Sequence, residues 1–185
     1  MREAIQRRLH GVGGNPADPG ALTPAAVLVP IVEWPAGLTV LFTRRADHMT
    51  SHAGQVSFPG GRWQPGDDGP AATALRETAE EIGLAPERIE VIGRLPVYNT
   101  GTGYSITPVV GFVRPPFALE PDPREVAEVF EVPLAFLLDP TNHRRDSMLW
   151  RGELHWYDAV PYAGQYIWGA TAGMVVRFAR LMAGP

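Results

Sequence analysis

The chain has 185 residues, 45% of them hydrophobic, so it is long enough for one domain with an ordinary core and short for two. Sixteen Lys and Arg residues against twenty Asp and Glu give a formal net charge of −4, which removes any overall electrostatic reason to expect nucleic-acid binding. The absence of cysteine excludes disulfides, thiolate metal ligands and cysteine nucleophiles.

The N-terminal part predicts a short amphipathic helix at residues 2–9, followed by a Gly-, Pro- and Asp-rich stretch, Gly11–Gly20, which is the one plausible linker. We therefore divide the chain into an N-terminal helix and loop, 1–20, and a main domain, 21–185. The start of the chain lacks the apolar run of a signal peptide, and no segment approaches the roughly 20 apolar residues of a membrane span. We expect a soluble cytoplasmic protein with no membrane partner.

Strand signals come next. Ala25–Trp34 and Leu38–Arg44 are rich in Val, Leu, Ile and Phe and are separated by Pro35-Ala36-Gly37, which predicts a hairpin. Gln55–Phe58 predicts a short strand, and Pro59-Gly60-Gly61 predicts the turn that ends it.

The central element is a predicted helix from about Pro70 to Ile82. Asp67 or Asp68 is available near its amino-terminal cap, Pro70 suits the first turn and Gly83 suits the stop.

Further strands are predicted at Ile89–Val97 and Ile106–Val113, and a hairpin at Met148–Tyr157, around Arg151-Gly152-Glu153. Two further helices are predicted, at Leu134–Leu138 and Ala170–Met182. Strands dominate before and after one central helix, so we expect an α/β fold in which a mixed β-sheet packs between helices.

The central helix carries three carboxylates on one face. Glu77, Glu80 and Glu81 fall within about 100° of one another on a helix that turns about 100° per residue. Like charges at this spacing repel, so the arrangement costs stability unless solvent, a cation or a positive side chain compensates it. A hard divalent cation such as Mg²⁺ is the compensation that also does chemistry. The alternative is a solvated acidic stripe on a surface helix.

The segment around these glutamates resembles the Nudix box, G-x5-E-x7-R-E-U-x-E-E-x-G-U, where U is aliphatic. Arg76–Leu84 reads Arg-Glu-Thr-Ala-Glu-Glu-Ile-Gly-Leu, and a Gly60-Gly61 pair lies upstream. The loop is one residue longer than the usual spacing, so the acidic position falls near Asp67 or Asp68. Thr78 replaces the usual aliphatic residue.

The resemblance implies an α/β/α sandwich and a metal-dependent pyrophosphohydrolase that uses Mg²⁺ or Mn²⁺. It implies that Glu77 and Glu81 ligate the metal with Glu80 in the same cluster, and that Arg76 orients a glutamate through an ion pair. These four residues form the expected catalytic set. Which glutamate acts as general base stays open.

A second segment lies upstream: Leu41–Ala46 reads Leu-Phe-Thr-Arg-Arg-Ala, and Gly54 and Phe58–Gly61 follow. These residues and their spacing resemble the signature of the coenzyme A pyrophosphatase branch of that family, L-L-T-x-R-[S/A]-x3-R-x3-G-x3-F-P-G-G. The second basic position of the signature falls on Thr50. The resemblance implies cleavage of coenzyme A or acyl-coenzyme A to adenosine 3′,5′-bisphosphate and (acyl-)4′-phosphopantetheine.

Coenzyme A carries a diphosphate and a 3′-phosphate, so arginines outside the metal site are expected to bind it. The predicted substrate-binding residues are Arg44, Arg45, Gly60, Gly61 and Arg62. The glycines would let the backbone approach the diphosphate. For Arg44 and Arg45 the alternative is a solvated strand end.

Other interpretations stay open at this point. The same chemistry on ADP-ribose, NADH or a nucleoside triphosphate is the nearest alternative, and a nucleotide-sensing module without turnover is the alternative of another class. Trp63, Trp156 and Tyr157 are candidates to stack on adenine, but we favour core or hairpin packing for each. The sequence leaves open a homodimer, the identity and number of metal ions, and the place of the 3′-phosphate.

Overall fold

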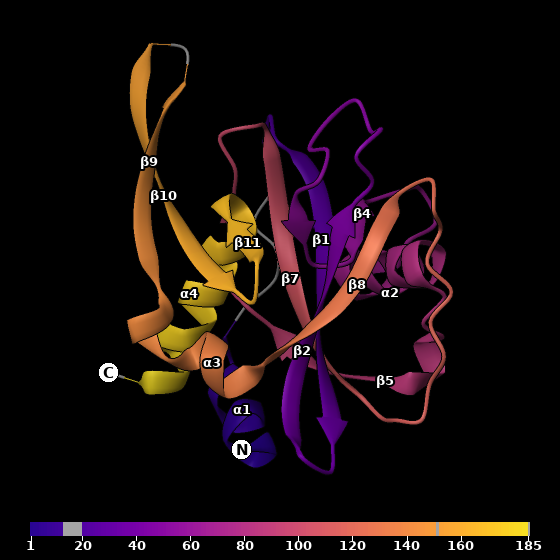
Figure 1. Cartoon of the computed structure of the whole chain (residues 1–185). Coiled ribbons are helices and arrows are strands. Elements are labelled where there is room, and N and C mark those ends of the chain that lie inside the picture. The colour runs from indigo at the N-terminus through magenta and orange to yellow at the C-terminus, as the bar shows by residue number, and fades with distance from the viewer. Residues whose placement is uncertain (13–19, 151, 185) are drawn as a thin grey trace.

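The computed structural model of the chain describes residues 1–12, 20–150 and 152–184 (Figure 1). The α-helices are α1 (Arg2–Leu9), α2 (Gly69–Ile82), α3 (Leu134–Leu138) and α4 (Gly169–Ala183), and single 3₁₀ turns lie at Pro86–Arg88 and Pro140–Asn142. The strands are β1 (Thr23–Trp34), β2 (Gly37–Arg45), β3 (Val56–Ser57), β4 (Gly60–Arg62), β5 (Ile89–Arg94), β6 (Tyr98–Asn99), β7 (Tyr104–Val113), β8 (Val126–Pro133), β9 (Arg144–Trp150), β10 (Glu153–Tyr162) and β11 (Gln165–Trp168). None of the helices within the described ranges is both long and apolar enough to cross a membrane.

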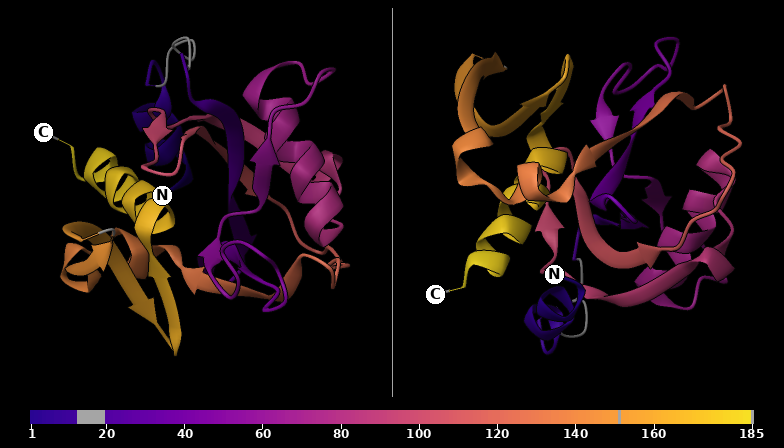
Figure 2. Two further views of the ribbon diagram at one scale, coloured as in Figure 1. Left: turned by 90° about the horizontal axis from the view of Figure 1, so that it is seen from above. Right: turned by 60° about the horizontal axis from the view of Figure 1, so that its bottom comes forward.

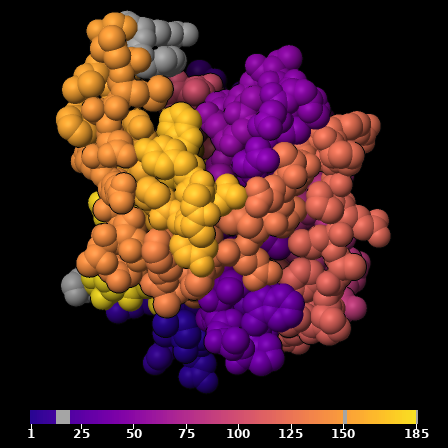
Figure 3. All heavy atoms as spheres, in the orientation of Figure 1, coloured from indigo at the N-terminus to yellow at the C-terminus, as the bar shows by residue number. Residues whose placement is uncertain are grey.

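The main sheet is mixed. Its strands follow the order β3-β2-β1-β7-β5, while β4 pairs with β1, β6 with β7 and β8 with β2. β1 and β7 run parallel, and the other pairs are antiparallel. A smaller antiparallel sheet has the order β11-β10-β9. Its strands β9 and β10 form an arm that projects along one margin of the molecule (Figures 1 and 3).

Both faces of the main sheet are buried, which explains why its strands are continuous apolar runs. Along β1, Val29 and Ile31 belong to one core cluster, whereas Leu28 and Val32 belong to another on the opposite face. The first cluster is covered by α1, α3 and α4, and the second by α2, so helices lie on both sides of the sheet (Figure 2). The predicted α/β/α sandwich with a mixed sheet is confirmed.

All four predicted helices are present, with ends within about two residues of the prediction. The turn predicted at Gly60-Gly61 is wrong, because both glycines lie in β4 and pair with β1. Strands β6, β8 and β11 were not predicted, and the strand predicted to reach Val97 ends at Arg94. Most of the predicted linker, 13–19, lies outside the described residues, and the domain boundary at 20 stays a prediction.

Helix α1 is part of the core. Ile5 and Leu9 are buried against the cluster that α4 covers. Arg2 fixes the start of the helix through ion pairs to Glu33 and Glu90, at 2.5 and 2.6 Å. The N-terminal helix therefore contributes to the packing of the domain.

We expect Ile5→Ala to lower the free energy of unfolding by about 2–5 kcal/mol, because it removes a fully buried aliphatic side chain and leaves a cavity. Urea denaturation checks this, with Arg7→Ala on the exposed side of the same helix as the control, expected within about 0.5 kcal/mol of wild type. Equal stabilities of the two variants would show that α1 does not belong to the folding unit.

Candidate active site

Helix α2 carries the predicted catalytic residues, and its ends follow the predicted signals. Pro70 lies in its first turn, and Gly83 ends it in the left-handed region with φ 68°. Asp68 occupies the cap position without a side-chain capping bond. The helix packs on the sheet through Ala74 and Ile82, which places Arg76 and the glutamates beside β4.

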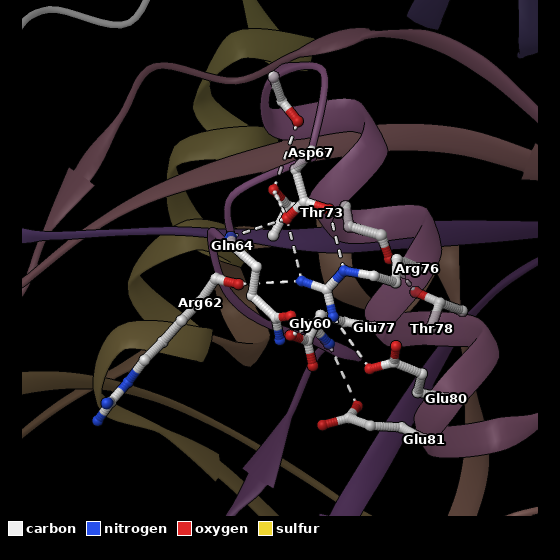
Figure 4. Close-up of polar contacts among 12 residues, drawn as sticks. Gly60, Arg62, Gln64, Asp67, Thr73, Arg76, Glu77, Thr78, Glu80 and Glu81 are labelled. Carbon is white, nitrogen blue, oxygen red and sulfur yellow. Dashed lines mark hydrogen bonds and ion pairs between the residues drawn. The ribbon is translucent and has the colours of Figure 1, made fainter.

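Arg76 is the centre of a hydrogen-bond network that joins α2 to the loop before it (Figure 4). Its Nη1 donates to Glu77 at 2.9 Å and to Glu80 at 3.0 Å. Nε and Nη2 each donate to Asp67 at 3.0 Å, and Nη2 also donates to the carbonyl of Arg62 at 3.1 Å. A guanidinium has five N–H donors, so all of them are used. The ion pair predicted for Arg76 is present, and it holds two of the glutamates.

Asp67 occupies the acidic position that the sequence placed near Asp67 or Asp68. Besides Arg76, its carboxylate accepts from the Gln64 amide at 3.0 Å and from the Thr73 hydroxyl at 2.9 Å. The bidentate arginine, assisted by these two donors, holds the pKa of Asp67 well below its usual range. The loop is thereby fastened to α2 at one ionised side chain.

The two glycines of β4 allow close approach to its neighbours, Gly60 to strand β1 and Gly61 to Glu77 of α2. A Cβ on Gly60 would lie 2.4 Å from the carbonyl oxygen of Ala26, and one on Gly61 would lie 2.5 Å from the carboxylate of Glu77. No side chain larger than hydrogen fits at either position without a shift of its neighbours. Gly60 and Gly61 therefore do not form the predicted turn; they are needed because β4 lies so close to β1 and to Glu77.

The three glutamates, predicted to share one face of the helix, differ strongly in exposure. The side chain of Glu80 is 58% exposed and that of Glu77 15%, while Glu81 is 6% exposed. Burial is the main reason that the pKa of Glu81 is raised to about 8; the charges of Glu125 and Glu77 act in the same direction, and the Gly60 amide, which donates to Glu81 at 3.2 Å, acts against them. Burial also raises the pKa of Glu77, against the opposing effect of Arg76.

Glu125 is a fourth acidic residue in this neighbourhood. Its charge acts on both Glu77 and Glu81. The segment before β8 crosses the end of α2, where the Asp122 amide donates to the Glu81 carbonyl at 2.9 Å, and the Glu125 carbonyl accepts from Ala46 at 2.8 Å. Glu125 was not among the predicted site residues, because no local pattern shows that this loop returns to α2.

The donor chemistry of this cluster fits a hard divalent cation. Glu77 and Glu81 each have one carboxylate oxygen in a hydrogen bond, to Arg76 and to Gly60, and the second oxygen of each remains available as a ligand. Buried, negatively charged oxygen donors with raised pKa values are stabilised by such a cation. Among the described residues, no three acidic or histidine side chains already converge on one point. The predicted ligand set therefore stays a prediction, and Glu80 is the member held farthest into solvent.

The predicted substrate arginines have different surroundings. Arg44 forms ion pairs with Asp47 at 3.0 Å and Glu128 at 3.4 Å. Arg45 lies close enough to Glu81 to lower its pKa, and its Nε is the one buried side-chain nitrogen or oxygen within the described ranges that has no hydrogen-bond partner. Arg62 donates to the hydroxyl of Tyr104, and its backbone carbonyl accepts from Arg76. Of the three, Arg45 has a donor to offer beside the carboxylates.

Comparison with known proteins decides the family. The NUDIX domain model matches residues 22–150, which is more than half of the chain and includes both the loop and α2. The chain belongs to the Nudix family. Nudix hydrolases generally use divalent metal ions such as Mg²⁺ or Mn²⁺.

Nudix proteins similar to this chain are known from Photorhabdus and Yersinia. The chain is 41% identical over 156 residues to "Uncharacterized Nudix hydrolase NudL" of Photorhabdus laumondii, covering 84% of this chain and 83% of the relative. A protein of the same name from Yersinia pestis is 40% identical over 161 residues, covering 84% of this chain and 78% of the relative.

Two solved structures share the fold. RenU of M. smegmatis aligns with a TM-score of 0.52 at 24% identity, covering 61% of this chain and 71% of its own. A C. elegans Ap4A hydrolase aligns with a TM-score of 0.52 at 19% identity, covering 60% and 80%. These likenesses concern the arrangement of the sheet and helices alone.

We expect Asp67→Asn to lower the free energy of unfolding at neutral pH, because it removes the charge that pairs with Arg76. The pKa of Asp67 is lowered in the folded state, so the pair contributes fully above the unfolded value of about 3.9 and its contribution is lost as the pH falls toward the lower folded value. The stability difference between wild type and Asp67→Asn should be constant from about pH 8 to 5 and shrink below about pH 4.

Urea denaturation across this pH range measures the difference. Asp68→Asn is the matched control, because the neighbouring exposed aspartate is outside the Arg76 network. A stability difference that stays constant into acid would mean that the Asp67 carboxylate is not the partner that holds Arg76.

Proposed function

We propose that this Nudix hydrolase cleaves the diphosphate of coenzyme A or acyl-coenzyme A, giving adenosine 3′,5′-bisphosphate and (acyl-)4′-phosphopantetheine. The observation that carries the hydrolytic part is the Arg76 network, which holds Glu77 and Glu80 beside buried Glu81 at the glycines of β4. The choice of substrate is supported by the resemblance of Leu41–Gly61 to the coenzyme A pyrophosphatase signature.

Each acidic residue has a proposed role. Glu77 and Glu81 are the proposed ligands of Mg²⁺ or Mn²⁺, with Glu80 in the same cluster. When bound, such ions neutralise the diphosphate and lower the pKa of a water molecule that attacks phosphorus. Arg76 does not contact the substrate in this proposal, since its five donors are already used; it fixes the position of Glu77.

The proposed phosphate-binding group is Arg45. Its unpartnered Nε lies in the interior beside Glu81, and a substrate phosphate oxygen is an acceptor of the right charge for it. In this proposal, Gly60 and Gly61 allow the backbone of β4 to lie close to the diphosphate, as they allow it to lie close to the carboxylates of Glu77 and Glu81. Arg44 is the weaker candidate, because Asp47 and Glu128 already pair with it.

A panel of substrates tests the proposal. With Mg²⁺ or Mn²⁺, the pure protein is expected to cleave coenzyme A with a higher kcat/KM than ADP-ribose, NADH or dNTPs, releasing adenosine 3′,5′-bisphosphate. Product identification by chromatography checks both the bond cleaved and the preference. Preferred cleavage of another member of the panel would reassign the substrate, and tight nucleotide binding with no turnover of any member would support the sensor interpretation.

Glu81→Gln tests the metal cluster. The amide keeps the size of the side chain and can still accept from Gly60, while the charge is lost from a buried position, so the variant should be at least as stable as wild type. Loss of outer-shell partners alone commonly costs about 10–100-fold, so loss of a ligand should lower turnover by more than about 100-fold.

Glu87→Gln, an exposed position in the 3₁₀ turn after α2, is the matched control and should retain wild-type turnover. Turnover and thermal melting of both variants separate loss of catalysis from loss of folding. Near-normal turnover in a folded Glu81→Gln protein would remove Glu81 from the mechanism.

A further inference from the structure

A hollow outside the carboxylate cluster lies between the start of α4, the turn after β6 and the arm formed by β9 and β10. Its volume is about 280 Å³, close to the lower end of the range of about 300–1,000 Å³ for small-molecule sites. It therefore has room for a nucleoside-sized group but not for a whole coenzyme. In Figure 1 the loop that leads into β7 lies between the arm and the upper ends of β1 and β7.

The walls of this hollow, the arm pocket, carry groups that suit a nucleobase. In the register of β9 and β10, Asp158 lies directly opposite Arg145, and Trp156 lies two positions before Asp158. The three side chains therefore share one face of the arm. Trp156 is 57% exposed, which leaves its ring open for stacking. Asn99 and Tyr98 line the pocket from β6. Asp158 and Asn99 can each accept an N–H from the edge of a base.

The arm pocket also carries net positive charge. Arg145 reaches it from β9 and Arg180 from the last turn of α4, while Asp158 is the one carboxylate among its described lining residues. An aromatic ring, acceptors for a base edge and two arginines are the chemistry that recognises a nucleotide with a phosphate on its ribose.

A short route connects the arm pocket with the carboxylate cluster. The carbonyl of Arg62 accepts from Arg76, and the guanidinium of Arg62 donates to the hydroxyl of Tyr104 and lies over its ring at 5.4 Å. Tyr104 is followed by Ser105, which pairs with Asn99 in the wall of the pocket. A chain of contacts through β4, β7 and β6 therefore joins the two sites, and occupation of both by one extended substrate is what the inference requires.

We infer that the arm pocket binds the adenosine 3′-phosphate end of the substrate, with the base stacked on Trp156 and the 3′-phosphate held by Arg145 and Arg180. The inference rests on the proposed function, because coenzyme A is the candidate substrate with a phosphate at this position. Trp156, for which sequence reasoning favoured packing, becomes a binding residue, and the 3′-phosphate acquires a site separate from the diphosphate site.

Binding of the free product tests this without turnover. Isothermal titration of the full chain should show that adenosine 3′,5′-bisphosphate binds about tenfold or more tightly than AMP, because the extra phosphate gains charge-assisted hydrogen bonds. The double variant Arg145→Gln/Arg180→Gln should lose this preference. Trp156→Ala should weaken both nucleotides by about tenfold, and Trp156→Phe should restore most of the affinity.

The matched control is Arg7→Gln/Arg8→Gln, which removes the same number of charges from the exposed end of α1 and should bind both nucleotides as wild type does. Equal affinities of the wild type for the two nucleotides, or unchanged binding by the arm-pocket variants, would overturn the inference.

Turnover of coenzyme A and dephospho-coenzyme A separates this inference from the proposed function. A wild type that prefers coenzyme A, with a preference lost in Arg145→Gln/Arg180→Gln, supports both. If both compounds are cleaved with the same kcat/KM, the proposed hydrolysis stands and the 3′-phosphate site is wrong. If neither is cleaved while adenosine 3′,5′-bisphosphate binds through the arm pocket, the proposed function is wrong and the nucleotide site stands.

Discussion

The candidate active site depends on the Arg76 guanidinium, all five of whose N–H donors form hydrogen bonds. One side chain binds Asp67 in the loop, the backbone of Arg62 at the end of β4, and two glutamates on its own helix. A planar group with five donors in fixed directions sets the position of each acceptor, which a flexible ammonium group would not do. The loop, the strand and the helix are therefore held in one arrangement, and the rest of the site is built on that arrangement.

Burial of Glu81 gives the site its chemical character. A carboxylate that has lost most of its water and faces Glu77 and Glu125 is unfavourable in its ionised form, as its raised pKa shows. Arg76 is directed to Asp67, Glu77 and Glu80, and Glu81 forms no salt bridge within the described part of the chain. A divalent cation at this position would relieve the repulsion. In this proposal, the same burial that costs stability to the metal-free protein increases its affinity for metal.

The parts of the structure that sequence reasoning predicted are those with local causes. Pro70 and Gly83 set the ends of α2 because capping acts within one turn, and the spacing of Arg76, Glu77 and Glu80 along the helix brings both carboxylates within reach of the guanidinium. Their different exposures could not be predicted, since these depend on how closely β4 approaches. The Gly60-Gly61 pair is a common turn signal, but it is used here because a Cβ would collide with Ala26 or Glu77. The path that brings Glu125 to Glu81 is set by long-range pairing of β8 with β2, for which no short segment carries a signal.

This division also explains why the reaction was easier to predict than the substrate. The proposed metal ligands and the network that holds them come from one continuous stretch, residues 60–81, so a single sequence pattern can contain them. The arm pocket is assembled from β6, the β9–β10 arm and α4, which are separated in sequence by tens of residues. Binding residues brought together only by the tertiary fold do not form a motif. In the proposed enzyme, the chemistry at the diphosphate is therefore set by local sequence, whereas recognition of the adenosine end depends on how the arm docks against the sheet.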